Sequence, residues 1–373
     1  MSTDLLPSFR KAFQFSRAWR SPPSILRESE VLIPVGEEVD PIPGTIIRPE
    51  GSETRGWIVL HGMTRLGRAH PELGRFVKAL ASTGASVLVP EIREWTELEF
   101  APQRAQEILR GAVNWLYRSP AIKPGGIMIA GLSFGAPQAL FAAADMELGR
   151  KIRGVVGWGG YADIERTFRF SFIGEHEWDG VSYRQRPDPY VRWVIGRNCI
   201  PLSASLGDRT ELVAALHQLA VEAGENRLHT WDPDSDPVKE ELRRQLPPSD
   251  RSLFDVFAPP VDREPDPEAS EALVSELVPA IRREIPLVEP VPFINQLSAP
   301  IRLLHGRSDH LIPFTETLRL GSALDPRASD LSTRLTGLFS HSGDNLGGGL
   351  WTRTRENIRF LGALQEIFEV AGG

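Results

Sequence analysis

Cysteine is almost absent from this chain of 373 residues, in which Cys199 stands alone. A single cysteine excludes an intrachain disulfide and a zinc cluster of thiolates. A chain of this length can bury a sizeable core without either of them. The cysteine content fits a reducing compartment, and we expect a cytoplasmic protein.

Long hydrophobic segments and blocks of like charge are also missing. No stretch approaches the roughly 20 apolar residues of a membrane span. Basic residues from Arg10 to Arg20 interrupt the amino terminus, so we expect no secretion signal there. The formal net charge is −7 and no long Lys/Arg block occurs, which leaves no electrostatic basis for binding nucleic acid. We expect neither an integral membrane segment nor a nucleic-acid partner.

The amino-terminal segment 1–25 places aromatic residues among these basic ones and allows two interpretations. A helix with Phe9, Phe13 and Trp19 could lie on a membrane surface. We favour the alternative, an arm that packs on its own domain or on a partner subunit, since peripheral membrane helices are the rarer use of such a pattern. Homo-oligomerisation therefore stays open.

Motifs for cofactors and catalytic metals are missing as well. No GxGxxG follows a strand-like run and no GxxxxGK[ST] occurs, so a nucleotide cofactor has no support. No HExxH motif occurs either. The cluster GEHEWDG at 174–180 has carboxylates and a histidine, but adjacent residues in a chain cannot all converge on one ion. We expect neither a cofactor nor a metal.

Short apolar runs alternate with helical patterns in the first half of the chain and again after residue 299. Such alternation is typical of a mostly parallel sheet covered by helices, an α/β fold. The predicted strands are 55–62, 85–92, 125–131, 152–160, 299–306 and 334–340. The predicted helices of these two regions are 71–84, 102–120, 135–146, 314–324 and 350–370.

Between about 164 and 298 the sequence becomes rich in Pro, Asp and Glu, with helical patterns at 210–224 and 270–285 and few strand-like runs. We interpret 164–298 as a mainly helical insertion into an α/β core formed by 26–163 and 299–373. The first part of the insertion is dense in aromatic residues, most of which we expect in its own core and one or two in a pocket. These are Phe168, Phe170, Phe172, Trp178, Tyr183, Tyr190 and Trp193.

Ser133 lies between two glycines in GLSFG, where a strand-like run meets a helical one. Side chains at 131 and 135 would collide with backbone in the tight turn that such a strand-to-helix passage needs. A serine hydroxyl is a poor nucleophile unless a base takes its proton and donors stabilise the oxyanion. The motif predicts a nucleophile, and the alternative is a small polar residue in a glycine-rich turn.

With this placement the sequence resembles the α/β-hydrolase fold family over 26–163 and again from 299 to the end. The resemblance implies a cap formed by the insertion and a Ser-His-Asp triad in the chain order nucleophile, acid, histidine. Asp309, directly after a late strand, looks like the family's acid, and Asp163 is the alternative acid. His341, between the last strand and the last helix, looks like the base.

The resemblance also implies an oxyanion hole made by the backbone amides of Phe134 and Met63. Phe134 follows the nucleophile, and Met63 follows the pair His61–Gly62 at the end of a strand. His61 is interpreted as a scaffold residue. Two arginines in the same loop are expected to be solvated, with binding of a substrate carboxylate as the alternative; they are Arg65 and Arg68.

The function that the resemblance implies is a serine hydrolase cleaving a small carboxylic ester through an acyl-enzyme. Thioester or amide hydrolysis uses the same residues, so the bond type stays open. A second hypothesis is carbon–carbon bond hydrolysis, or a lyase reaction, on the same framework. A third is a non-catalytic binding protein of this fold, against which the ordered set of three residues argues.

Overall fold

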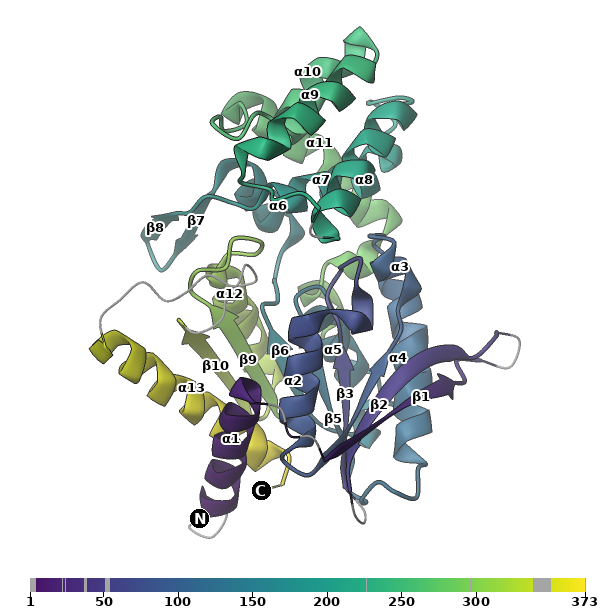
Figure 1. The fold of residues 1–373 in the computed structure, drawn as a ribbon, viewed down its shortest axis with the longest axis vertical. Coiled ribbons are helices and arrows are strands. Elements are labelled where there is room, and N and C mark those ends of the chain that lie inside the picture. Colours follow the sequence, from purple (N-terminus) through teal and green to yellow (C-terminus); the bar gives the residue numbers. More distant parts are fainter. Residues whose placement is uncertain are drawn as a thin grey trace.

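The computed structural model describes residues 5–21, 23, 25–36, 39–50, 54–225, 227–295, 297–337 and 350–372. A central sheet covered by helices on both faces forms the lower part of Figure 1, and a mainly helical layer lies over one edge of that sheet. Residue 341, the predicted base, lies outside the described residues.

The central sheet has eight strands in the order β1-β2-β4-β3-β5-β6-β9-β10. They are β1 (Leu26–Ile33), β2 (Ile42–Pro49), β3 (Arg55–Leu60), β4 (Ala85–Pro90), β5 (Ile127–Leu132), β6 (Ile152–Trp158), β9 (Ile301–Gly306) and β10 (Leu331–Thr336). The pairs β1–β2 and β2–β4 are antiparallel, and the other neighbours are parallel. The prediction of a mostly parallel sheet is confirmed, and the loops after its parallel strands gather at one edge.

The side chains of β4 and β9 are buried throughout and those of β3 after its first residue, which is why these strands read as continuous apolar runs. Two strands at the edges read differently. β1 is largely exposed, and the hairpin of β1 and β2 was not predicted. β10 begins three residues before the predicted run at 334–340 and ends at Thr336. Its side chains are partly exposed and mostly polar, so its first residues did not form an apolar run that could be recognised.

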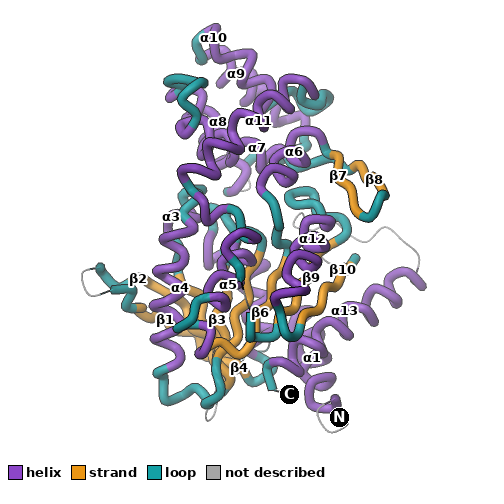
Figure 2. Tube along the Cα trace, turned by 180° about the vertical axis from the view of Figure 1, so that it is seen from behind, coloured by secondary structure: helices purple, strands orange, loops and turns teal. Residues whose placement is uncertain are grey.

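Side chains of successive strand residues point to opposite faces, and each face has its own core. Ile58 and Leu60 of β3 pack in the core on one face, and Trp57 and Val59 in the core on the other. The first face is covered by α4 (Pro102–Tyr117), α5 (Gly135–Ala144) and α12 (Phe314–Leu324), and the second by α1 (Leu5–Arg20), α2 (Pro71–Ala81) and α13 (Leu350–Val370), as Figures 1 and 2 show from two sides.

The amino-terminal helix α1 packs on the protein's own core. Phe15 is buried, with its ring centroid 5.6 Å from that of Phe76 in α2 and 6.3 Å from that of Phe368 in α13. This is the arrangement that we favoured for the arm. Phe9 and Phe13 lie on its exposed side. Within the described ranges, no helix has both the length and the apolar character needed to cross a membrane.

The insertion leaves the sheet after β6 and returns at β9, its direct neighbour in the sheet. Its elements are α6 (Ile164–Ile173), β7 (Glu175–Trp178), β8 (Val181–Arg184), α7 (Pro189–Cys199), α8 (Thr210–Gly224), α9 (Asp236–Gln245), α10 (Pro248–Phe257) and α11 (Pro267–Glu284). Four of its predicted aromatic residues are buried, and all but Phe170 belong to the main hydrophobic core; they are Phe168, Phe170, Phe172 and Trp193.

The acidic cluster at 174–180 forms β7 and the turn of the hairpin of β7 and β8. Asp179 and Gly180 have φ values of +52° and +74°, the left-handed pair that a two-residue hairpin turn requires. In the part of the chain that the structure describes, no three histidine, cysteine or carboxylate side chains are grouped as metal ligands would be.

His176 in β7 gives the hairpin a dependence on pH. Its ring lies 5.1 Å from that of Tyr183 and 5.2 Å from that of Phe314. Burial, with a smaller contribution from His305, lowers the pKa of His176 from 6.5 to about 4. Between these two values the unfolded chain binds more protons than the folded one, so the free energy of unfolding falls as the pH drops.

We therefore expect the thermal unfolding temperature to decrease as the pH is lowered from 6.5 to 4, and His176→Gln to show a flatter decrease. Unfolding followed by circular dichroism across this range measures both slopes. Equal slopes for the two proteins would contradict the assignment to His176.

Candidate active site

Ser133 lies in the turn between β5 and α5, at the edge of the sheet where the parallel strands end. Its φ of +52° is in the left-handed region that non-glycine residues rarely adopt. The Ser133 N–H donates to the Trp158 carbonyl at 2.7 Å, and the Ser133 carbonyl accepts from the Ala136 N–H at 2.9 Å. These bonds hold a conformation that costs about 1–3 kcal/mol.

The glycines beside Ser133 are required by close approach of backbone. A Cβ at Gly131 would lie 2.1 Å from the Gly135 carbonyl oxygen, and one at Gly135 would lie 3.0 Å from Cβ of Leu60. Gly62, in the loop after β3, also lies close to the serine, since a Cβ there would lie 3.4 Å from Cβ of Ser133. The predicted collision with backbone is confirmed at position 131, whereas at 135 an added Cβ would make tight contacts with Leu60 and His61.

Phe134 occupies the position before α5, and its side chain is buried among aromatic rings. It stacks on Phe100 at 5.4 Å and meets Trp95 edge to face at 5.5 Å between centroids. With the side chain anchored, the backbone at the amino terminus of α5 is fixed beside Ser133. Partial positive charge at that terminus faces the serine turn.

His61 in the loop after β3 is a neutral scaffold residue. Its Nδ1 lies 2.8 Å from the Gly62 carbonyl oxygen, and its Nε2 accepts from the Ile92 N–H at 3.3 Å. A carbonyl oxygen only accepts, so the hydrogen is on Nδ1. Burial lowers the pKa of His61, which keeps the ring neutral. The loop continues to Met63, whose carbonyl accepts from the Tyr190 hydroxyl of α7 at 3.3 Å.

The two arginines of this loop are engaged in structural contacts. Arg65 donates to the Thr96 carbonyl at 2.6 Å and pairs with Glu225 at 3.4 Å. Arg68 pairs at 2.6 Å with a carboxylate on each side, and these belong to Glu30 and Glu91. The expectation that both arginines are solvated is wrong, because carboxylates of β1, of the segment after β4 and of the insertion surround them.

Asp309 follows β9 and is 2% exposed. Its Oδ1 accepts from the N–H groups of Leu311 at 2.9 Å and Ile312 at 3.1 Å. Its Oδ2 lies 3.2 Å from Nε2 of His305, a fully buried residue of β9. Nε2 also lies 3.0 Å from the Ile312 carbonyl and so carries a hydrogen. The sequence placed His305 at the strand end but did not predict this contact; its spacing of four residues from Asp309 was the available signal.

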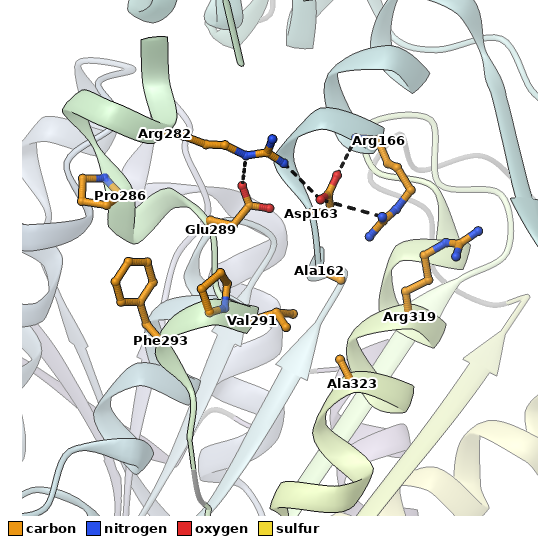
Figure 3. Close-up of a pocket in the computed structure, with 11 residues that line it drawn as sticks. Ala162, Asp163, Arg166, Arg282, Pro286, Glu289, Val291, Phe293, Arg319 and Ala323 are labelled. Atoms are coloured by element: carbon orange, nitrogen blue, oxygen red, sulfur yellow. Dashed lines mark hydrogen bonds and ion pairs between the residues drawn. The ribbon is translucent and has the colours of Figure 1, made fainter. Parts of the chain in front are cut away.

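Asp163, the alternative acid, follows β6 and caps α6. Its Oδ1 accepts from the Arg166 N–H at 2.8 Å, and its Oδ2 lies 3.2 Å from Nη2 of Arg282. The carboxylate thus joins the beginning of the insertion to its last helix, α11. Figure 3 shows this group with Glu289, which pairs with Arg282 at 2.6 Å.

A cavity of about 550 Å³ opens beside Asp163, where the insertion leaves and rejoins the core. Ion pairs line one wall, and Val291, Phe293 and Ala323 line another. Its described lining includes neither Ser133 nor Asp309. The cavity is therefore a feature of the junction between the insertion and the sheet.

The structure brings Ser133 and Asp309 to the same edge of the sheet, because β5 and β9 both end there and only β6 separates them. The segment with His341 connects β10 to α13 and lies outside the described residues, so the structure does not place its imidazole. Of the predicted oxyanion residues, Phe134 belongs to the same turn as Ser133, and Met63 belongs to the loop after β3.

Comparison with known proteins gave matches among solved structures alone; no family model and no curated protein matches this chain. The esterase Est22 is 15% identical with a TM-score of 0.52, over 99% of this chain and 87% of that one. A putative hydrolase from Legionella pneumophila is 10% identical with a TM-score of 0.52, over 97% and 95%. The acylaminoacyl peptidase of Pyrococcus horikoshii is 12% identical with a TM-score of 0.51, over 93% of this chain and 42% of the peptidase, so this chain spans less than half of its length.

The chain has the α/β-hydrolase fold. The strand order and the position of the insertion after β6 agree with the fold class predicted from the sequence. In the α/β-hydrolase fold a serine on a strained strand-to-helix turn is the nucleophile, and the acid and the histidine follow in the chain. Ser133 has that turn in this structure, and Asp309 and His341 follow in that order.

Proposed function

We propose that this protein is a serine hydrolase that cleaves a small carboxylic ester. Ser133 attacks the carbonyl carbon, and His341 accepts the hydroxyl proton and returns it to the leaving alcohol. Asp309 orients His341, and the amides of Phe134 and Met63 stabilise the oxyanion. Water, activated by His341, then hydrolyses the acyl-enzyme.

The observation that carries the proposal is the backbone of Ser133. A non-glycine residue at φ +52° is strained, and such strain persists mainly where function requires it. The positive φ of Ser133 ends β5 in a sharp turn, and Gly131 and Gly135 permit the close approach of β5 and α5 on either side of it. A serine in an ordinary surface turn can share the positive φ, as Asp179 of the β7–β8 hairpin does, but not the close approach of a buried strand and helix on both sides.

Asp309 fits the role of acid better than Asp163. Two backbone N–H groups hold Oδ1 of the buried Asp309 carboxylate, and Oδ2 lies 3.2 Å from Nε2 of His305. These contacts fix the orientation of the carboxylate, which the role of acid requires. Both oxygens of Asp163 are already occupied by the cap of α6 and by Arg282.

The bond that is cleaved is open to experiment. Est22 is named an esterase, and the Pyrococcus horikoshii protein a peptidase, so the shared fold is compatible with more than one acyl substrate. We favour an ester, and a panel of p-nitrophenyl esters, thioesters, anilides and diketones separates the alternatives, including carbon–carbon bond hydrolysis.

Labelling with a fluorophosphonate probe tests the proposal directly. We expect one equivalent of probe on the native protein, located at Ser133 by peptide mapping, and none on Ser133→Ala or on heat-denatured protein. Failure to label native Ser133 would contradict the proposal and would leave a non-catalytic binding protein as the better interpretation.

A pair of matched variants identifies the acid. We expect Asp309→Asn to lower kcat on a p-nitrophenyl ester by about 10³- to 10⁴-fold, because the histidine loses its orienting carboxylate. Asp163→Asn should keep kcat within about threefold and lower stability by at most about 1 kcal/mol, because asparagine still caps α6 while the ion pair with Arg282 is lost. The opposite pattern would make Asp163 the acid.

A further inference from the structure

The residue after Asp309 is held by the insertion. The carbonyl of His310 accepts from the Asp188 N–H at 2.8 Å, and its Nδ1 lies 2.7 Å from the Arg186 carbonyl oxygen. Since that oxygen only accepts, Nδ1 carries the hydrogen. The ring of Trp231 meets the imidazole of His310 edge to face at 4.7 Å. The insertion therefore fixes the chain next to Asp309 from above, while His305 supports the carboxylate from the sheet.

The same part of the insertion also holds the loop with the proposed oxyanion donor. The Met63 N–H and the Gly62 carbonyl belong to one peptide unit, which His61 fixes through its bond to that carbonyl at 2.8 Å. The Met63 carbonyl belongs to the next peptide unit, which Tyr190 fixes through its hydroxyl at 3.3 Å. Both peptide planes that meet at Met63 are thus oriented by side chains.

Residues 186–190, here called the clamp segment, connect these two contacts over five consecutive positions. The segment is itself anchored. Asp188 caps α7 by accepting from the Tyr190 N–H at 3.0 Å, and Trp231 Nε1 donates to the Pro187 carbonyl at 3.4 Å. The Arg186 guanidinium lies 5.9 Å from the centroid of the Trp231 ring. A shift of the segment would move the supports of Asp309 and Met63 together.

We propose that the clamp segment positions both the acid and the oxyanion donor, with Tyr190 and His310 as positioning residues that touch neither substrate nor reacting atoms. This inference rests on the proposed function. Under this inference the insertion orients the catalytic residues as well as covering the edge of the sheet on which they lie.

The reason for an effect on rate is geometric. An oxyanion donor acts only within about 2.7–3.1 Å of the position that the oxyanion takes in the transition state, and loss of one donor costs about 10²- to 10³-fold. Tyr190 acts on the peptide unit after the donor, so its removal loosens the donor without deleting it. We expect about a tenfold loss of kcat, between no effect and full loss of the donor.

Tyr190→Phe is the sharpest test, because it removes one hydroxyl. We expect kcat on a p-nitrophenyl ester to fall about tenfold with KM within about twofold. The rate of fluorophosphonate labelling should fall in parallel, since phosphonylation of Ser133 uses the same donors. Tyr161→Phe is the matched control. It keeps the ring that stacks on Phe134 at 6.3 Å and removes only a hydroxyl that donates to the Val288 carbonyl at 2.9 Å, at the base of the insertion.

His310 provides a second test on the acid side. We expect His310→Ala to lower kcat and to lower the apparent pKa of the kcat/KM profile, because a displaced Asp309 stabilises the protonated histidine less. His310→Asn, whose amide can donate to the Arg186 carbonyl, should restore most of both values. A purely structural role would change the unfolding temperature and leave the pH profile in place.

The outcomes separate this inference from the proposed function. If native Ser133 is not labelled by the probe, both fail. If Ser133 is labelled and Tyr190→Phe and His310→Ala keep the wild-type kcat and labelling rate, the positioning role alone is overturned. An equal loss of kcat in Tyr161→Phe would also overturn it, because the effect would then come from general loosening of the insertion.

Discussion

Ser133→Ala is expected to lower kcat on a p-nitrophenyl ester by at least about 10⁴-fold, because the nucleophile is lost while the oxyanion donors remain. The variant should fold as the wild type does, since the bonds of residue 133 to Trp158 and Ala136 use backbone atoms alone. Initial rates measured at saturating ester, with circular dichroism as the check on folding, give the result. Retained turnover in the folded variant would exclude Ser133 as the nucleophile.

A comparison of Ser133→Ala with Ser133→Gly measures the strain at this position. Alanine at φ +52° suffers the same backbone conflict as serine, whereas glycine adopts this conformation readily. We expect the glycine variant to be more stable than the alanine variant by about 1 kcal/mol, although both are inactive. Equal stability of the two variants would mean that the turn is not strained in solution.

Gly131→Ala is expected to destabilise the fold by about 3–5 kcal/mol, at the upper end of single substitutions. The added Cβ would lie 2.1 Å from the Gly135 carbonyl oxygen and 2.8 Å from Cα of Ala136. Both are backbone atoms at the start of α5, so a change of side-chain rotamer gives no relief and the turn that holds Ser133 must move. Denaturant unfolding measures the loss, and fluorophosphonate labelling should fall with it.

Gly74→Ala is the control for this substitution. Gly74 lies inside α2, and no atom lies within 4 Å of the position of an added Cβ. Alanine is the better helix former by up to about 1 kcal/mol, so this variant should be slightly stabilised. A Gly131→Ala protein as stable as Gly74→Ala would contradict the close packing of β5 on α5.

The sequence predicted those parts of the fold in which local pattern and burial agree. Strands β4 and β5 are buried on both faces, so their apolar runs were clear. β1 and β10 lie at the two edges of the sheet, where one side is partly exposed and the apolar pattern is weak. The first was missed and the second was placed too late in the chain.

For the candidate site, the sequence predicted where the site residues lie in the fold but not the hydrogen bonds that hold their loops. Ser133 and Asp309 follow strands of one parallel sheet, and the shared edge brings their loops to the same side. The hydrogen bond from Tyr190 to the Met63 carbonyl joins residues 127 positions apart. It forms only through the tertiary packing of the insertion on the core, which local sequence does not reveal. The ion pair of Arg65 could not be predicted for the same reason, because its partner Glu225 lies 160 positions later in the chain, after α8.

The two junctions of the insertion lie on adjacent strands, since β6 leads into it and β9 receives it. Evolution could therefore lengthen, shorten or exchange this segment without altering the pairing of any strand. The bonds from Asp188 and Tyr190 restrict that freedom. If the clamp segment has the proposed positioning role, a foreign insertion grafted onto this sheet would have to supply equivalent hydrogen bonds to residues 63 and 310. Without these bonds we expect a chimera that folds but hydrolyses its ester slowly.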